Sequence, residues 1–441
     1  MTAMIGPFIE TMQELGTPDA IRARAAARLT PALRPQINAH VHLPPNFSAF
    51  ETTRQAVEMA DAQDVRILGA SNYYDYSVYA ELAARAGQRG IFPIFGLEII
   101  SRVDDLVQAG VKVNDPGNPG KYYFCGKGIT RFAPMADEAR GLLQVIRDND
   151  SARMAAVADK LAAVFAGAGL TTGLDAEAVK DRVVARHGSP RETVYLQERH
   201  VAQAFQEALF EKIPEGDRPA LLGRAYGAPP KAGPDDAVGT QNEIRSQLLK
   251  AGKPAYVPET FVDFDHARRL ILALGGIPCY PTLVDGASPI TEYEASPEAL
   301  IADLQARHIP CAEFIPNRNT PAVLSRYVHA MRRAGLFVTA GTEHNTLDLI
   351  PLAPTCLNGQ PIPEDVQAIF WEGACVLVAH QYLTQTGQPG FVDGAGVPDP
   401  AYPTADARIA AYRALGAAVL ARYGEVTTKM NPAREVPGYS E

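Results

Sequence analysis

Two histidines one residue apart follow a short apolar run near the start of the chain. The stretch INAHVHLPPNF begins at Ile37 and contains His40 and His42. Val and Ile favour a strand here, and the alternation of side chains along a strand places both rings on the same side. Neutral imidazoles in this arrangement are suitable ligands for Zn, Mn or Fe. His-x-His alone is a weak signal, and histidines satisfied by core partners are the competing interpretation.

The elements that must position these rings form a repeating pattern. The runs QINAHVH, VRILGAS and GIFPIFGLEII alternate with expected helices over 49–62 and 76–86. Later in the chain GIPCYPTL, IPCAEFIP and LFVTAGTEHN alternate with helical stretches in the same way. This β-α-β rhythm predicts an α/β fold with parallel strands joined by crossover helices. In a βα barrel of this kind, the carboxyl ends of the strands share one rim.

The sequence divides into five expected segments. The stretch 130–258 is rich in Ala, Glu, Arg, Leu and Gln at helical spacing, without a convincing strand, and predicts a helical insertion grown from one barrel loop. The remaining segments are a helical lead-in (1–35), the two barrel parts (36–129 and 259–355) and a C-terminal helical extension (356–441). The extension contains an Ala- and Leu-rich face typical of packing onto a core.

Composition limits the classes of function. The 441 residues are 46% hydrophobic and 21% charged, which is typical of a folded protein, and the net charge of −9 argues against nucleic-acid or membrane-surface partners. Five scattered cysteines indicate neither a disulfide framework nor a cysteine zinc module. No secretory pattern opens the chain, and no run approaches the roughly 18 apolar residues of a membrane span. We expect a cytoplasmic protein with a small anionic substrate, whose oligomeric state the sequence leaves unknown.

Polar residues also stand at the ends of the other expected strands. An apolar strand rarely ends in charge without a partner for it, so these residues strengthen the metal interpretation. The set comprises Asn72, Glu98, Tyr123 with Lys127, Tyr280, Glu313 with Arg318, and Thr342, Glu343 and His344.

These motifs resemble a known family. INAHVH, GLEII, YYFCGKGI, GGIPCYPT, CAEFIP and TAGTEHN occur in the order found in the PHP (polymerase and histidinol phosphatase) superfamily, over about 37–129 and 263–345. The resemblance implies a distorted (βα)7 TIM-like barrel that binds up to three metals, usually for phosphoester hydrolysis. It implies that His40 and His42 are the family's His-x-His ligands, that Glu98 is its bridging carboxylate, and that His344 is its final histidine.

The ligand set departs from the family pattern. Asn72, Tyr123 and Tyr280 stand where the family has histidines, and Thr342 takes the usual aspartate position beside Glu343. In the family arrangement these losses fall mainly on the second and third metals. We therefore expect one divalent ion (Zn, Mn or Fe). Its expected ligands are His40, His42, Glu98 and a residue of the last motif, Glu343 or His344.

The remaining candidates have roles in substrate chemistry. Tyr123 and Tyr280 are expected to donate hydrogen bonds or move protons, or else to fill the space of absent metals. Glu313 is expected to act as a general base or else to pair with a nearby cation. Residues expected to bind the substrate anion, or else to be solvated rim groups, are Asn72, Lys127, Arg131 and Arg318. We expect a metal-dependent hydrolase of PHP type, a phosphoesterase. The alternatives are a metal-dependent lyase or isomerase of a sugar-derived acid and a non-catalytic binding protein.

Overall fold

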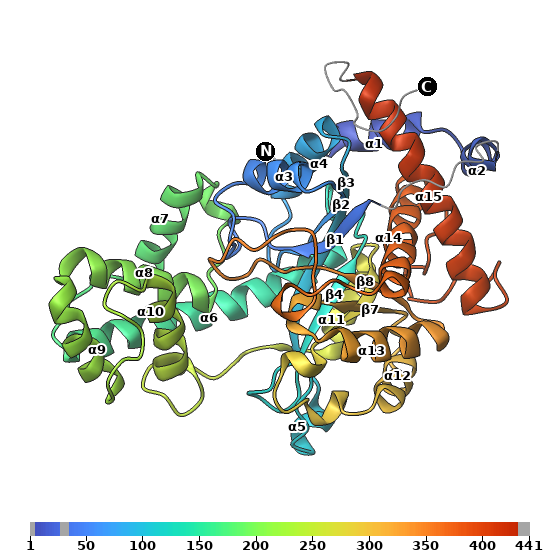
Figure 1. The fold of residues 1–441 in the computed structure, drawn as a ribbon. Coiled ribbons are helices and arrows are strands. Elements are labelled where there is room, and N and C mark those ends of the chain that lie inside the picture. The colour runs from blue at the N-terminus through green and yellow to red at the C-terminus, as the bar shows by residue number, and fades with distance from the viewer. Residues whose placement is uncertain (1–4, 27–34, 431–441) are drawn as a thin grey trace.

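The structure, a computed structural model, describes residues 5–26 and 35–430 (Figure 1). Parts of the expected lead-in and extension (1–4, 27–34 and 431–441) lie outside the described residues. Seven strands follow one another around a nearly closed barrel in the order β1-β2-β3-β4-β6-β7-β8, and the short β5 pairs with β3. Neighbouring strands are parallel except β4, which runs antiparallel to β3 and β6. The expected distorted TIM-like α/β barrel is therefore confirmed.

The strand bounds show which residues reach the rim. Both members of the β3-β4 hairpin are long, and the antiparallel pairing extends from Gly96 opposite Lys127 to Arg102 opposite Lys121. The strands are β1 (Gln36–Val41), β2 (Val65–Ala70), β3 (Phe92–Arg102), β4 (Lys121–Lys127), β5 (Val262–Asp263), β6 (Ile277–Thr282), β7 (Cys311–Phe314) and β8 (Phe337–Ala340).

Backbone hydrogen bonds bring the first strand to the segment that follows the last one. The His42 N–H donates to the Glu343 carbonyl at 2.8 Å, and the Glu343 N–H donates to the His40 carbonyl at 2.8 Å. Residues about three hundred positions apart in the chain therefore lie side by side at the point where the barrel closes.

Helices cover the outside of the barrel, as the β-α-β rhythm predicts. The buried faces of α3, α4, α11, α13 and α14 pack on the strands, and α14 comes close to β8 at Gly373, where a Cβ atom would lie 2.1 Å from the Val338 carbonyl oxygen. At the N-terminal end, Phe8 of α1 packs edge-on against Phe92 and Tyr423. The helices outside the insertion are α1 (Gly6–Glu14), α2 (Pro18–Ala26), α3 (Thr53–Ala62), α4 (Val78–Gln88), α5 (Asp104–Gln108), α11 (Phe264–Ala273), α12 (Pro297–Ala306), α13 (Pro321–Arg333), α14 (Glu364–Gln385) and α15 (Ala405–Met430).

A second group of helices lies to one side of the barrel and has an apolar core of its own (Figure 1). It occupies the part of the chain where the sequence predicts a helical insertion. Phe165, Val201 and Phe205 belong to its core. The helices are α6 (Asp137–Gly167), α7 (Ala176–His187), α8 (Glu198–Lys212), α9 (Arg218–Tyr226) and α10 (Ala237–Ile244), followed by the π-helical segment η3 (Arg245–Leu249). Across the described part of the chain, no helix is both long enough and apolar enough to cross a membrane.

His380 of α14 is a buried histidine that the fold keeps neutral. The Phe391 N–H donates to its Nδ1 at 3.0 Å, so Nε2 carries the proton and donates to the Gly275 carbonyl at 2.9 Å. Burial lowers the pKa of His380 to about 4, from an ordinary value of 6.5. Because the folded pKa is depressed, the associated stability is fully present above pH 6.5 and is lost as the pH falls through 4.

We therefore expect the free energy of unfolding to fall between pH 6.5 and pH 4, and His380→Gln to make that fall shallower. The variant lacks one group that takes up a proton on unfolding, so the slope of the unfolding free energy against pH should change by about 1.4 kcal/mol per pH unit. Urea unfolding at several pH values measures the slope, with His308→Gln, an exposed histidine, as the control. Equal slopes for the wild type and His380→Gln would contradict this assignment.

Candidate metal centre

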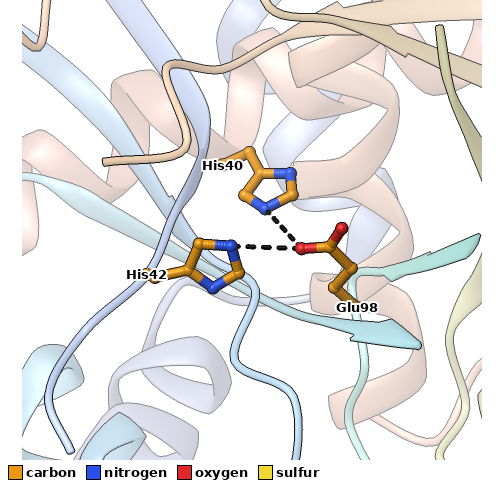
Figure 2. A group of neighbouring side chains, drawn as sticks. All are labelled: His40, His42 and Glu98. Atoms are coloured by element: carbon orange, nitrogen blue, oxygen red, sulfur yellow. Dashed lines mark ion pairs between the residues drawn. The ribbon is translucent and has the colours of Figure 1, made fainter. Parts of the chain in front are cut away.

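The end of β1 and the middle of β3 bring three potential ligands together (Figure 2). Glu98 Oε2 lies 3.1 Å from His42 Nε2 and 3.6 Å from His40 Nε2. One ligand atom from each of the three residues lies within 4.8 Å of the others. Both histidines are fully buried, and Glu98 is 4% exposed.

The donor atoms of this cluster fit a divalent cation. His40 Nε2, both ring nitrogens of His42 and Glu98 Oε2 are buried without a hydrogen-bond partner among the described residues. Buried polar atoms are rarely left in this state, because each loses its hydration without compensation. Two imidazole nitrogens and a carboxylate oxygen facing one point are a ligand set for Zn, Mn or Fe.

A buried ion pair fixes the orientation of His40. The Nδ1 atom of His40 lies 2.6 Å from Glu313 Oε1, and the Lys127 ammonium lies 2.7 Å from Glu313 Oε2. All three side chains have 0% exposure. With Nδ1 donating to Glu313, the other ring nitrogen, Nε2, faces Glu98. A carboxylate that holds the second nitrogen in this way is the usual outer partner of a metal-ligating histidine.

The same contacts set the charge states of the cluster. Burial by itself raises the pKa of the Glu98 carboxyl, but the close approach of the His40 and His42 rings outweighs it, so the pKa is lowered. Burial and the Lys127 charge act to lower the pKa of His40, but Glu313 outweighs them, so the pKa is raised. Glu98 therefore stays ionised at neutral pH, which is the form that a metal ligand needs.

A second group of potential ligands shares His40 and is less suited to a cation. It consists of His40, Cys125 and Glu313. The Lys127 ammonium already occupies Glu313 at 2.7 Å, and it would repel a second cation there. Burial also raises the pKa of the Cys125 thiol to about 12, which disfavours the thiolate. The group around Glu98 is therefore the candidate centre.

Glycine is required beside His40 where the chain leaves β8. A Cβ atom at Gly341 would lie 2.3 Å from the Cβ atom of His40. The next residues then turn sharply, because Glu343 and His344 have φ values of +58° and +53°. Non-glycine residues rarely adopt this left-handed conformation. The turn determines where the two side chains of the last motif point.

The carboxylate of Glu343 is held by Arg318 and Asn345. Arg318 Nη1 donates to Glu343 Oε1 at 2.9 Å, the second guanidinium nitrogen contacts Oε2, and Asn345 Nδ2 lies 2.5 Å from Oε2. Glu343 and Arg318 thus form a bidentate pair, with Glu343 outside the His40, His42 and Glu98 cluster.

The ring of His344 is also engaged away from the cluster. Its Nδ1 lies 2.7 Å from Thr342 Oγ1, and its Nε2 lies 2.9 Å from the Ile350 carbonyl oxygen. The ring stacks on Phe50, with a centroid distance of 4.7 Å. Burial lowers the pKa of His344 to about 4. In this structure neither nitrogen is free to ligate a metal, so the candidate centre consists of His40, His42 and Glu98.

Three other residues singled out in the sequence do not face the centre. Asn72 makes a reciprocal pair with the backbone of Leu43, at 2.9 Å in both directions. The Tyr280 hydroxyl donates to Glu294 at 2.6 Å. Arg131 is exposed in the connection that follows β4. The polar groups of Asn72 and Tyr280 are therefore used in contacts within the fold.

A cavity of about 400 Å³ opens beside Glu98. Of the residues expected to bind substrate or to act in catalysis, Tyr123 and Arg318 line it. Glu313 and Lys127 instead lie fully buried beside His40. The insertion supplies part of the wall, with Gln197, Glu198, Arg199, Arg245 and Lys250. The sequence gives no signal for these five residues beyond their place in a helical insertion.

Tyr73 is a further residue of the centre. Its ring stacks on His42 with a centroid distance of 5.2 Å and an interplanar angle of 7°. Burial, followed by the charge of Glu98, raises the pKa of the Tyr73 phenol well above its ordinary value. The phenol therefore stays protonated at neutral pH. In the sequence, the feature that points to Tyr73 is its position just after the second expected strand, VRILGAS.

Comparisons with known proteins give matches in structure alone. No family model and no curated protein matches the chain. An amidohydrolase from Chromobacterium violaceum, solved with sulfate and without metal, has a TM-score of 0.48 at 20% identity, covering 76% of this chain and 96% of its own. A Bifidobacterium adolescentis protein, named provisionally as a metal-dependent phosphoesterase, has a TM-score of 0.50 at 16% identity, covering 78% and 97%. The second likeness shows a shared fold.

Titration of chelator-treated protein with Zn²⁺, followed by calorimetry, tests the centre. We expect one tightly bound equivalent, and about 10-fold or greater weakening by His42→Ala or Glu98→Gln. His344→Gln is the matched control and should leave the affinity unchanged, because both ring nitrogens of His344 have other partners. Two tight equivalents, or equal weakening by His344→Gln, would contradict this ligand set.

The ion pair beneath His40 makes a separate prediction about stability. Lys127→Met leaves the Glu313 carboxylate buried without its ammonium partner, and we expect a loss of about 3–5 kcal/mol in the free energy of unfolding. The double variant Lys127→Met/Glu313→Gln should recover part of that loss, because the unpaired charge is gone. Urea unfolding measures both. A loss below about 1 kcal/mol in the single variant would show that the pair is not buried as described.

Proposed function

We propose that the protein is a metal-dependent hydrolase that cleaves a phosphoester of a small anionic substrate at the His40, His42 and Glu98 centre. The observation that carries the proposal is the set of buried donor atoms that have no hydrogen-bond partner among the described residues and adjoin a cavity of about 400 Å³ at Glu98. A cavity of this size suits a small molecule.

The residues around the cavity supply the remaining chemistry. His40, His42 and Glu98 would hold a divalent cation, which would supply Lewis acidity and lower the pKa of a bound water. His40 is held by Glu313, and Arg318 is fixed by Glu343, so both are placed before substrate binds. Burial raises the pKa of Tyr123, which keeps its phenol as a hydrogen-bond donor at neutral pH. The donor can stabilise charge on a substrate oxygen.

Three further observations support phosphoester chemistry. The motif order resembles that of the PHP superfamily, whose members usually hydrolyse phosphoesters. The Bifidobacterium adolescentis protein with the same fold carries a phosphoesterase name. The cavity wall also contains Arg199 and Arg245, cations that suit an anionic substrate.

Phosphate release from a panel of phosphomonoesters, with Zn²⁺, Mn²⁺ or Fe²⁺ added to chelator-treated protein, tests the proposal. We expect metal-dependent release, and a loss of about 100-fold or more in kcat/KM for His42→Ala, since the variant lacks a ligand. The control is His187→Gln, which changes a histidine of α7 outside the centre. Binding of the panel without any turnover by the metal-loaded protein would contradict the proposal and favour a binding protein. Conversion of a sugar-derived acid without phosphate release would instead favour a lyase or isomerase.

A further inference from the structure

Two arginines of the insertion face the same cavity as Glu98. Arg199 belongs to the first turn of α8, and Arg245 begins the segment η3. Both line the cavity together with Glu98 and Tyr123. The insertion therefore delivers positive charge to the mouth of the barrel, next to the candidate centre.

These arginines differ from the other cations of the cavity wall in having no carboxylate partner within the described ranges 5–26 and 35–430. The Arg199 guanidinium lies over the ring of Phe47, at 5.8 Å from its centroid. Arg245 Nε is buried and has no hydrogen-bond partner in the described part of the chain. The paired cations are Arg318 with Glu343, Lys121 with Asp115 and Glu259, and Arg153 and Lys250 with Glu198.

The two charges act on each other. Burial and then the charge of Arg245 lower the pKa of Arg199 to about 10. Glu343 acts on Arg199 and Glu198 on Arg245 from a distance, but neither carboxylate forms a direct ion pair with these arginines among the described residues. Two cations held near each other in a partly buried site without a directly paired anion are unfavourable, and an anion that both can contact removes the repulsion. Such an arrangement in a cavity indicates a ligand site.

The position of the pair connects it to the candidate centre. Glu343, Tyr123 and Tyr73 act electrostatically on Arg199 and raise its pKa. Tyr73 in turn stacks on His42. An anion bound by Arg199 and Arg245 would therefore lie at the border of the His40, His42 and Glu98 cluster. Guanidinium groups bind tetrahedral oxyanions through two parallel N–H donors, and a phosphate monoester carries the double charge that two arginines match.

We propose that Arg199 and Arg245 form the phosphate-binding subsite of this cavity and so make the insertion a determinant of substrate specificity. The subsite rests on the proposed function only for its role in turnover, because phosphate binding is measurable without metal or hydrolysis. It also explains why the insertion contributes to the cavity wall: the barrel alone leaves the cavity without an unpaired cation, since Arg318 and Lys121 are both neutralised.

Calorimetric titration of the metal-free, full-length protein with inorganic phosphate tests the subsite. We expect saturable binding by the wild type and a weakening of about 10-fold or more in both Arg199→Gln and Arg245→Gln, as for loss of a hydrogen-bonded charge. Arg199→Lys should retain part of the affinity, because the charge remains and the bidentate geometry is lost. Circular dichroism and thermal unfolding of each variant verify that the fold is kept.

Arg182→Gln is the matched control. This arginine also belongs to the insertion, but it pairs with Glu211 and does not line the cavity, so phosphate affinity should not change. Wild-type protein that fails to bind phosphate, or Arg199→Gln and Arg245→Gln variants that bind it as tightly as the wild type, would overturn the proposal. If the protein binds phosphate through these arginines but hydrolyses no phosphoester, the result would support the subsite and contradict the proposed function. Where hydrolysis is observed, the two glutamine variants should raise KM more than they lower kcat.

Discussion

The architecture of the centre depends on one buried interaction, the ion pair between Lys127 and Glu313 beneath His40. Two full charges in the interior are tolerated because each has close partners: Lys127 also donates to the Ala39 carbonyl and the Ser71 hydroxyl, and Glu313 also accepts from His40. These contacts join β1, β4 and β7 with the residue that follows β2, and they leave Nε2 of His40 facing Glu98. The free donor atoms of the cluster are thus a consequence of a polar network that is otherwise satisfied.

The cavity requires parts of the chain that are distant in sequence. Its inner wall comes from the barrel, where closure beside Gly341 brings the last motif against His40. Its outer wall comes from the insertion, which has its own apolar core and can therefore hold charged side chains in fixed positions. A separately packed element is well suited to vary the recognised substrate while the barrel keeps the chemistry, as is usual for loops grown on barrel rims.

The fold followed from local patterns that are strong in this sequence, namely short β-branched runs separated by amphipathic helices. The same reasoning placed His40, His42 and Glu98 at strand positions that could meet, because alternation and the shared rim require no knowledge of long-range packing. It could not orient the last motif, since the left-handed turn at Glu343 and His344 directs both side chains to local partners. Nor could it anticipate Arg199 and Arg245, whose approach to the cavity depends on how the insertion packs against the barrel.

The most direct measurement is an anomalous difference map, recorded at the zinc absorption edge, from crystals of the zinc-loaded protein. The account predicts a single strong peak in contact with ring nitrogens of His40 and His42 and with the carboxylate of Glu98. A peak at His344 without these three residues, or a cluster that stays empty at saturating zinc, would contradict it.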